Sequence, residues 1–136
     1  MARKAVVDAV EARLAANWLT TPIIGLNTAQ GDAPSDGSAF IRVEYPVADD
    51  RQLTFGAPGD NWWREEGAFR IIINAERASG VATGLAWAET LAALFLGKDF
   101  GVQTFAPGSP AIDERNDQGN YYQLSFAVPY QFDFLG

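Results

Sequence analysis

The most constraining feature of the sequence is the C-terminal run YYQLSFAVPYQFDFL at positions 121–135. From position 122 onward, every second residue is large and apolar, and the residues between them are small or polar. Side chains of a β-strand point alternately to opposite faces, so this period of two predicts a long strand with one buried face. Pro129 has no N–H to donate, so we expect it at a sheet edge or a bulge. The apolar members are Tyr122, Leu124, Phe126, Val128, Tyr130, Phe132 and Phe134.

Shorter segments show further strand signals. FIRVEYPV at 40–47 alternates apolar and polar residues, and RQLTF at 51–55 follows after a turn, which together predict a β-hairpin. AFRIIINAER at 68–77 predicts another strand, with Phe69, Ile71, Ile73 and Ala75 on one face. Short strands are also predicted at 23–26 and 100–105. Loops are predicted at 27–38, 56–66 and 106–120, where Gly, Pro, Asp and Ser are concentrated.

Two segments have helical periodicity. Residues 2–18 place Val7, Val10, Leu14 and Trp18 on one stripe. Residues 80–96 form a second helix, which Ser79 precedes and Gly97 ends. Helix, four strands, helix and two strands predict a single α+β domain over residues 1–136. We expect a mostly antiparallel sheet with the two helices packed on one face.

The helix at 80–96 is apolar around too much of its circumference. Its main stripe is extended by Trp87, Leu91 and Leu94, so the apolar arc covers about 200°, against the roughly 100° that one core requires. Two interpretations stay open: a deeply buried central helix, or a helix whose excess face packs on another subunit. On the second interpretation Trp87, Leu91 and Leu94 are interface candidates.

The stretch GDNWWREEG at 59–67 places two tryptophans among polar residues. We interpret 56–66 as a loop in which one of Trp62 and Trp63 anchors the loop and the other is an interface residue. Arg64 could then pair with a carboxylate across that contact, with Glu65 and Glu66 on the solvated rim. The alternative is that both tryptophans begin the following strand, one on each face of the sheet.

Composition argues against several function classes. There is no histidine and no cysteine, so the usual general base and the usual zinc ligands are missing. The paired acids Asp49-Asp50 and Glu65-Glu66 are interpreted as solvated carboxylates. DERNDQGN at 113–120 departs from a calcium loop because Arg115 stands where a ligand should be. We therefore expect no catalytic, cofactor or metal site, and no enzyme.

The charge balance and hydropathy indicate which partners and which cellular environment suit the chain. Ten basic and seventeen acidic residues give a net charge of −7, and the basic residues are scattered. Nucleic-acid binding needs clustered Lys and Arg, so we expect no specific nucleic-acid binding. No stretch approaches the roughly 18 apolar residues of a membrane helix. We expect a soluble protein of the cytoplasm with no membrane association.

The order of these pieces resembles one family of proteins. FIRVEYP is followed by FG, WREEGAFRIII, GVATGLAWAETLAALFLG and GNYYQLSFAVPYQFDF. Together they resemble the tail terminator family of long-tailed bacteriophages, prophages and gene transfer agents, over nearly the whole chain. Asn61-Trp62-Trp63 has no counterpart in the pattern, so the resemblance implies no role for it. The residues that match best are Arg64 and Gly67 before a strand, Phe95 at the end of the Ala-rich helix, and Pro129, Tyr130 and Phe132.

The resemblance implies a structural protein that forms a hexameric ring. Such a ring caps the tail tube, stops its polymerisation and joins it to the head-side connector or stopper protein, with DNA passing through. Assembly would take place in the host cytoplasm, and the protein would then belong to the particle tail. Two alternatives stay open: a head-closure or adaptor protein of the same particle, or a regulatory α+β domain that binds a small molecule.

We expect the purified chain to leave duplex DNA unretarded in a gel-shift assay at about 150 mM salt, where long-range electrostatic attraction is screened. The reason is the acidic balance and the lack of a basic cluster. Retention of a duplex at that salt concentration would contradict this prediction.

Overall fold

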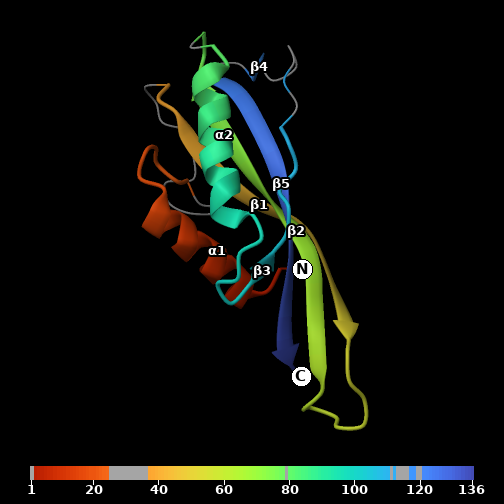
Figure 1. The fold of residues 1–136 in the computed structure, drawn as a ribbon. Coiled ribbons are helices and arrows are strands. Elements are labelled where there is room, and N and C mark those ends of the chain that lie inside the picture. The colour runs from red at the N-terminus through yellow and green to blue at the C-terminus, as the bar shows by residue number, and fades with distance from the viewer. Residues whose placement is uncertain (1, 25–36, 79, 111, 113–116, 119–120) are drawn as a thin grey trace.

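The computed structural model describes residues 2–24, 37–78, 80–110, 112, 117–118 and 121–136. Two helices and a sheet account for most of the described chain (Figure 1). In chain order the elements are α1 (Lys4–Asn17), β1 (Phe40–Gln52), β2 (Trp62–Glu76), α2 (Ala82–Phe95), β3 (Gln103–Thr104), β4 (Asp117–Gln118) and β5 (Tyr121–Leu135).

The sheet is antiparallel and is built around β2 and β5. Its strand order is β1-β2-β5-β3, and β4 also pairs with β5. β2 and β5 pair along their whole length, from Trp62 opposite Leu135 to Glu76 opposite Tyr121. On its other side, within the described residues, β5 pairs with the short strands β3 and β4. β5 is thus not an edge strand, but the Pro129 carbonyl oxygen accepts the Phe105 N–H on that side, so the missing N–H of Pro129 interrupts no long ladder.

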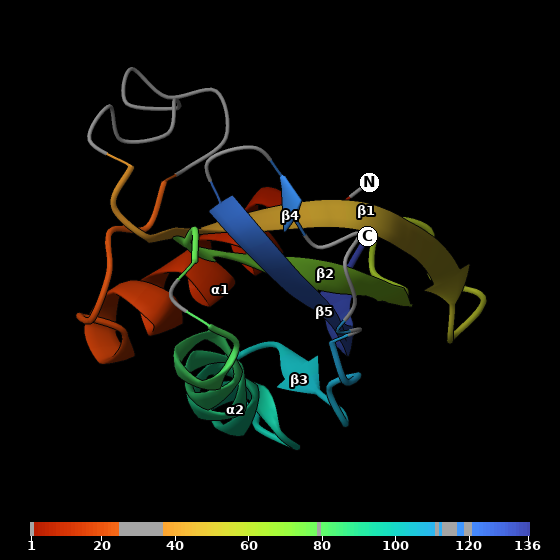
Figure 2. The same ribbon diagram turned by 90° about the horizontal axis from the view of Figure 1, so that it is seen from above.

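Both helices cover the same face of the sheet, as Figure 2 shows from above. The residues buried between the layers come from α1, α2 and the three long strands, with every second strand residue contributing. This confirms a single α+β fold with two helices on one face of an antiparallel sheet. The core includes Val6, Val10, Leu14, Ile41, Val43, Phe69, Ile71, Ile73, Ala88, Leu91, Phe95, Leu124, Phe126 and Val128.

Two strand boundaries predicted from the sequence are wrong. The expected hairpin of 40–47 and 51–55 is one continuous strand, β1, with a register shift between Glu44 and Val47. The expected loop over 56–66 ends early, because β2 begins at Trp62. A bulge lets β1 pass Pro46 without ending, since the unpaired residues leave the ladder there.

The two shorter predicted strands pair over fewer residues than expected. The segment predicted at 100–105 pairs only at Gln103 and Thr104. The segment predicted at 23–26 makes one parallel bridge, between Ile23 and Ile41. Gly25 and Leu26, and Ser79 before α2, lie outside the described residues.

The ends of β1, β2 and β5 continue past the two helices as a projecting three-stranded arm (Figure 1). We define the arm as residues 47–52 of β1, 62–66 of β2 and 131–135 of β5, together with the connecting residues 53–61. The arm begins where the bulge of β1 crosses Gly67 of β2. A Cβ on Gly67 would lie 2.2 Å from the Val47 carbonyl oxygen and 2.9 Å from the Ala48 Cα. Two backbones therefore meet at the base of the arm, and the close approach requires glycine.

We predict that Gly67→Ala destabilises the domain by about 2 kcal/mol or more, because a methyl group there must push the backbone of β1 aside. The measurement is the free energy of unfolding in urea. Gly108→Ala is the matched control, because a Cβ there would lie 3.7 Å from the nearest atom, the Ala127 carbonyl oxygen. Equal stability of the two variants would contradict the prediction.

Candidate functional site

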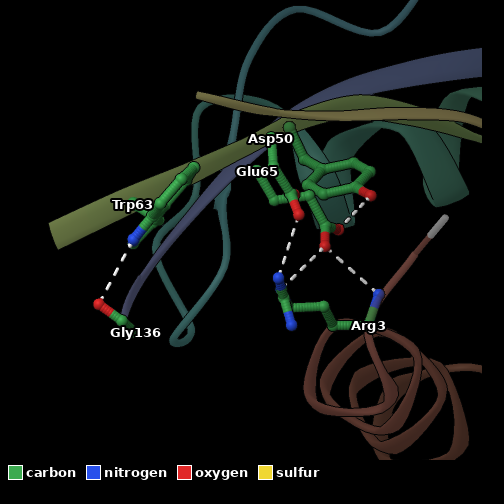
Figure 3. Close-up of polar contacts among 6 residues, drawn as sticks. Arg3, Asp50, Trp63, Glu65 and Gly136 are labelled. Carbon is green, nitrogen blue, oxygen red and sulfur yellow. Dashed lines mark hydrogen bonds and ion pairs between the residues drawn. The ribbon is translucent and has the colours of Figure 1, made fainter. Parts of the chain in front are cut away.

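The two tryptophans begin β2 and lie on opposite faces of the arm. Trp63 is on the helix side, opposite Phe134, and its indole Nε1 donates to the Gly136 carbonyl oxygen at 3.3 Å (Figure 3). Trp62 is on the other face, opposite Leu135, and 46% of it is exposed. The alternative reading of GDNWWREEG, with one tryptophan on each face of a strand, is thus the observed structure. Whether Trp62 contacts another chain stays a prediction.

The tip of the arm is held by main-chain and side-chain hydrogen bonds. Asn61 and Gly136 exchange two backbone hydrogen bonds of 3.1 and 2.9 Å, which ties the end of the chain to the start of β2. The Thr54 hydroxyl accepts the Trp62 N–H at 2.8 Å. Phe55 remains 82% exposed in this ordered setting. The arm therefore presents three apolar side chains at its end: Phe55, Trp62 and Leu135.

Arg64 is engaged within its own chain. Its guanidinium donates from Nε and Nη2 to the two oxygens of Asp133, at 2.7 and 2.9 Å. These hydrogen bonds lower the pKa of the Asp133 carboxyl. Within this chain the adjacent strand β5 supplies the carboxylate, and an additional contact of Arg64 with another chain stays a prediction.

The position of Glu65 differs most from the one predicted from the sequence. Glu65 was expected on a solvated rim, but its side chain is completely buried on the helix side of the sheet. One carboxylate oxygen accepts the Tyr130 hydroxyl at 2.6 Å, and the other accepts the backbone N–H of Arg3 at 3.2 Å. A buried carboxylate is costly unless it is hydrogen-bonded or paired, so these contacts hold it in place. The alternation of β2 sends Glu65 inward.

Arg3 completes this cluster from the residue just before α1. Its Nε lies 3.6 Å from Glu65, and its Nη2 donates to Asp50 at 2.9 Å (Figure 3). The guanidinium carbon lies 3.5 Å from the centre of the Phe134 ring. Asp50, expected as a solvated carboxylate, is therefore paired. No local pattern predicts these contacts, because Arg3 is 47 residues from Asp50 and 62 from Glu65.

The candidates on α2 face the inside of the chain. Leu91 has no exposed surface and packs in the core of its own chain. Trp87 packs edge-to-face on Trp18, which follows α1, with ring centres 6.1 Å apart. Leu94 packs partly buried against the same core, and its carbonyl oxygen accepts the Arg13 side chain at 2.8 Å. This side of α2 is largely occupied by the protein's own first helix.

The open apolar surface lies on the other flank of α2. A groove of about 470 Å³ runs between α2 and the segment that follows β3. Glu89 is the one charged residue among its described lining residues, and Leu96 at its border is exposed. The wide apolar arc was a usable signal for such a surface, although the candidates named from the sequence, Trp87, Leu91 and Leu94, do not line the groove. The lining residues are Leu85, Ala88, Glu89, Ala92, Ala93, Leu96, Pro107, Gly108, Ser109, Pro110, Ile112 and Phe126.

Within the described residues no cluster of three or more acidic, His or Cys side chains is placed to hold a metal ion. In that same part of the chain no helix has the length and apolar character to span a membrane. Most of DERNDQGN lies outside the described residues.

The architecture is that of a small α+β protein whose prominent features are an apolar-tipped arm and an apolar groove, both surfaces suited to contact with other chains. The family whose model matches residues 5–130 is described as phage tail terminator protein. The chain belongs to this family, as its sequence resemblance indicated. It is accordingly a structural protein of a phage tail.

A solved structure supports the fold. It matches with a TM-score of 0.61 at 19% sequence identity, over 100% of this chain and 99% of that one. At this identity the likeness concerns the fold alone. No curated protein matches the chain.

Two buried tyrosine hydroxyls give a matched pair for testing the site. Tyr130 donates to Glu65, whereas the buried hydroxyl of Tyr45 has no partner within the described chain. We predict that Tyr130→Phe costs about 1–3 kcal/mol of stability, because it leaves a buried carboxylate short of a donor. Tyr45→Phe should be neutral or slightly stabilising, because it removes an unsatisfied group. Urea unfolding at neutral pH measures both, and an equal loss in the two variants would contradict the prediction.

The same two tyrosines predict alkaline destabilisation. Burial, and for Tyr130 also the hydrogen bond to Glu65, raises the pKa of both hydroxyls above the usual value. In the unfolded chain they lose their protons near pH 10, before the folded chain does. The stability contribution is therefore complete below about pH 10 and declines as pH rises further. Unfolding free energies measured across this range should fall less steeply for Tyr45→Phe than for the parent.

Proposed function

We propose that the chain assembles into a closed ring of six subunits that caps the finished tail tube and stops its polymerisation. The side of the ring away from the tube would meet the head-side connector. The observation that carries this proposal is the arm, with Phe55, Trp62 and Leu135 exposed at its end, on a chain of the phage tail terminator family. Exposed aromatic residues at the end of a fixed arm are suited to a contact with another protein.

A closed ring needs two different patches on each subunit, since each interface joins one patch to another. The chain offers two candidates that do not overlap in sequence. One is the end of the arm, and the other is the groove beside α2 with Leu96 at its border. The flank of α2 that carries Trp87 and Leu94 contributes less, because it packs toward α1.

The charge of the chain fits a ring around a DNA conduit. Each copy has a formal net charge of −7, so a ring of several copies is strongly acidic. A wall of this sign repels the phosphate backbone, which reduces adhesion of passing DNA. On this proposal the ring assembles in the host cytoplasm and stays in the particle, with DNA as a passing cargo.

The alternative of a head-closure or adaptor protein shares the structural class but has a different partner. A terminator binds the tail tube protein, whereas an adaptor binds the connector first. Pull-down of purified tube protein and purified connector protein by this chain separates the two. The groove is the one observation that favours a small-molecule role, but its lining has few polar groups to fix the orientation of a ligand.

We predict that Trp62→Ala leaves the thermal midpoint nearly unchanged but yields overlong tails or prevents ring formation. The reason is that Trp62 lies on the outer face of the arm and is half exposed. Trp63→Ala should lower the midpoint, because Trp63 packs within its own chain and donates to Gly136. The measurements are a melting curve, native mass spectrometry of assembled rings, and tail lengths by electron microscopy.

Leu19→Ala is the matched control, since Leu19 is a large apolar residue, 85% exposed, that lies away from the arm. It should change neither the melting curve nor the tails. Normal tails from Trp62→Ala would reject the arm as the capping surface.

A further inference from the structure

Arg3 contacts all three strands of the arm. It pairs with Asp50 on β1 at 2.9 Å, lies 3.6 Å from Glu65 on β2, and stacks on Phe134 of β5 with 3.5 Å between the guanidinium carbon and the ring centre. A guanidinium can do this because it is planar, keeps its charge, and packs on an aromatic face while its edges donate. One side chain thereby connects the strands at the base of the arm.

The carboxylate of Glu65 makes this contact specific. Glu65 is fully buried, and Tyr130 gives it a neutral hydroxyl donor. Arg3 is the one described cation within ion-pair distance of it. A buried carboxylate that loses its cation is costly, whereas an exposed ion pair contributes little. We therefore expect loss of the Arg3–Glu65 contact to affect the arm more than loss of the exposed Arg3–Asp50 pair.

Arg3 is also the first residue of the helical layer. Its carbonyl oxygen accepts the backbone N–H groups of Val6 and Val7, at 3.0 and 3.1 Å, which starts α1. Its own N–H donates to Glu65. The positive end of the α1 dipole thus lies beside the Glu65 carboxylate. The direction of α1 and that of the arm are fixed at the same residue.

We propose that Arg3 is a latch that holds the arm against the start of α1 and so sets the direction in which Trp62 is presented. The body of the domain does not depend on it, because the core between the helices and the sheet is formed by other residues. The arm projects beyond the helices, so it has less packing to restrain it than the rest of the sheet (Figure 1). The importance of this direction for tail capping rests on the proposed function; the latch itself does not.

Hydrogen exchange of the purified full chain tests the latch. In Arg3→Met, which keeps an apolar stem but loses the guanidinium, amide exchange in 47–52, 62–66 and 131–135 should accelerate by about tenfold or more. Exchange in the core segments 69–73 and 124–128 should stay as in the parent. Lys4→Ala is the matched control: it removes the same charge one residue later, where the ammonium is exposed and pairs with Asp8. It should change neither region.

Asp50→Asn provides a second variant that removes one exposed ion pair and leaves the buried core unchanged in composition. It should accelerate exchange mainly in 47–52. Unchanged exchange of the arm in Arg3→Met, or equal acceleration of arm and core, would overturn the latch. Tail length is scored in parallel: a loosened arm with normal tails supports the latch and counts against the arm as the capping surface.

Discussion

Both the packed core and the arm depend on the pairing of β2 with β5. It runs unbroken from Trp62 opposite Leu135 to Glu76 opposite Tyr121, and it is longer than either helix can cover. Over most of its length, its inner face carries the apolar residues that pack under α1 and α2. At the Trp62 end the same ladder continues without a helix above it, and this continuation is the arm. Backbone hydrogen bonds thus hold the sheet together beyond the region that the hydrophobic core covers.

A polar cluster replaces the core at the point where the helical cover ends. Glu65 occupies an inward position of β2, and Tyr130 and Arg3 satisfy it. Burying this charge is costly without its donors, so the position of Glu65 depends on Tyr130 and Arg3. The cluster restricts the orientation of the arm relative to α1, because a carboxylate accepts hydrogen bonds only from donors in particular positions. Gly67 lies at the base of the arm, where the β1 backbone crosses β2 at close distance.

Much of the fold could be predicted from the sequence, and the site much less. The period of two in residues 121–135 and the helical stripes identified the long strand, both helices and the one-sided sheet, because the pattern of apolar residues is set by the geometry of each element. The same reasoning ended β1 near Pro46 and began β2 too late. A bulge and the pairing with distant strands override these local signals, so a polar stretch such as GDNWW is predicted as a loop although it enters a ladder.

By itself, the sequence determined which residues alternate, how much apolar surface must be covered, and that the chain is acidic and lacks histidine and cysteine. It also carried the family resemblance. Only the tertiary structure decided that Glu65 is buried, that Arg64 binds Asp133, and that the open flank of α2 is the one away from Trp87. Each of these depends on a partner far along the chain. A periodic pattern states that a residue faces inward or outward, but only the packed elements specify what it meets there.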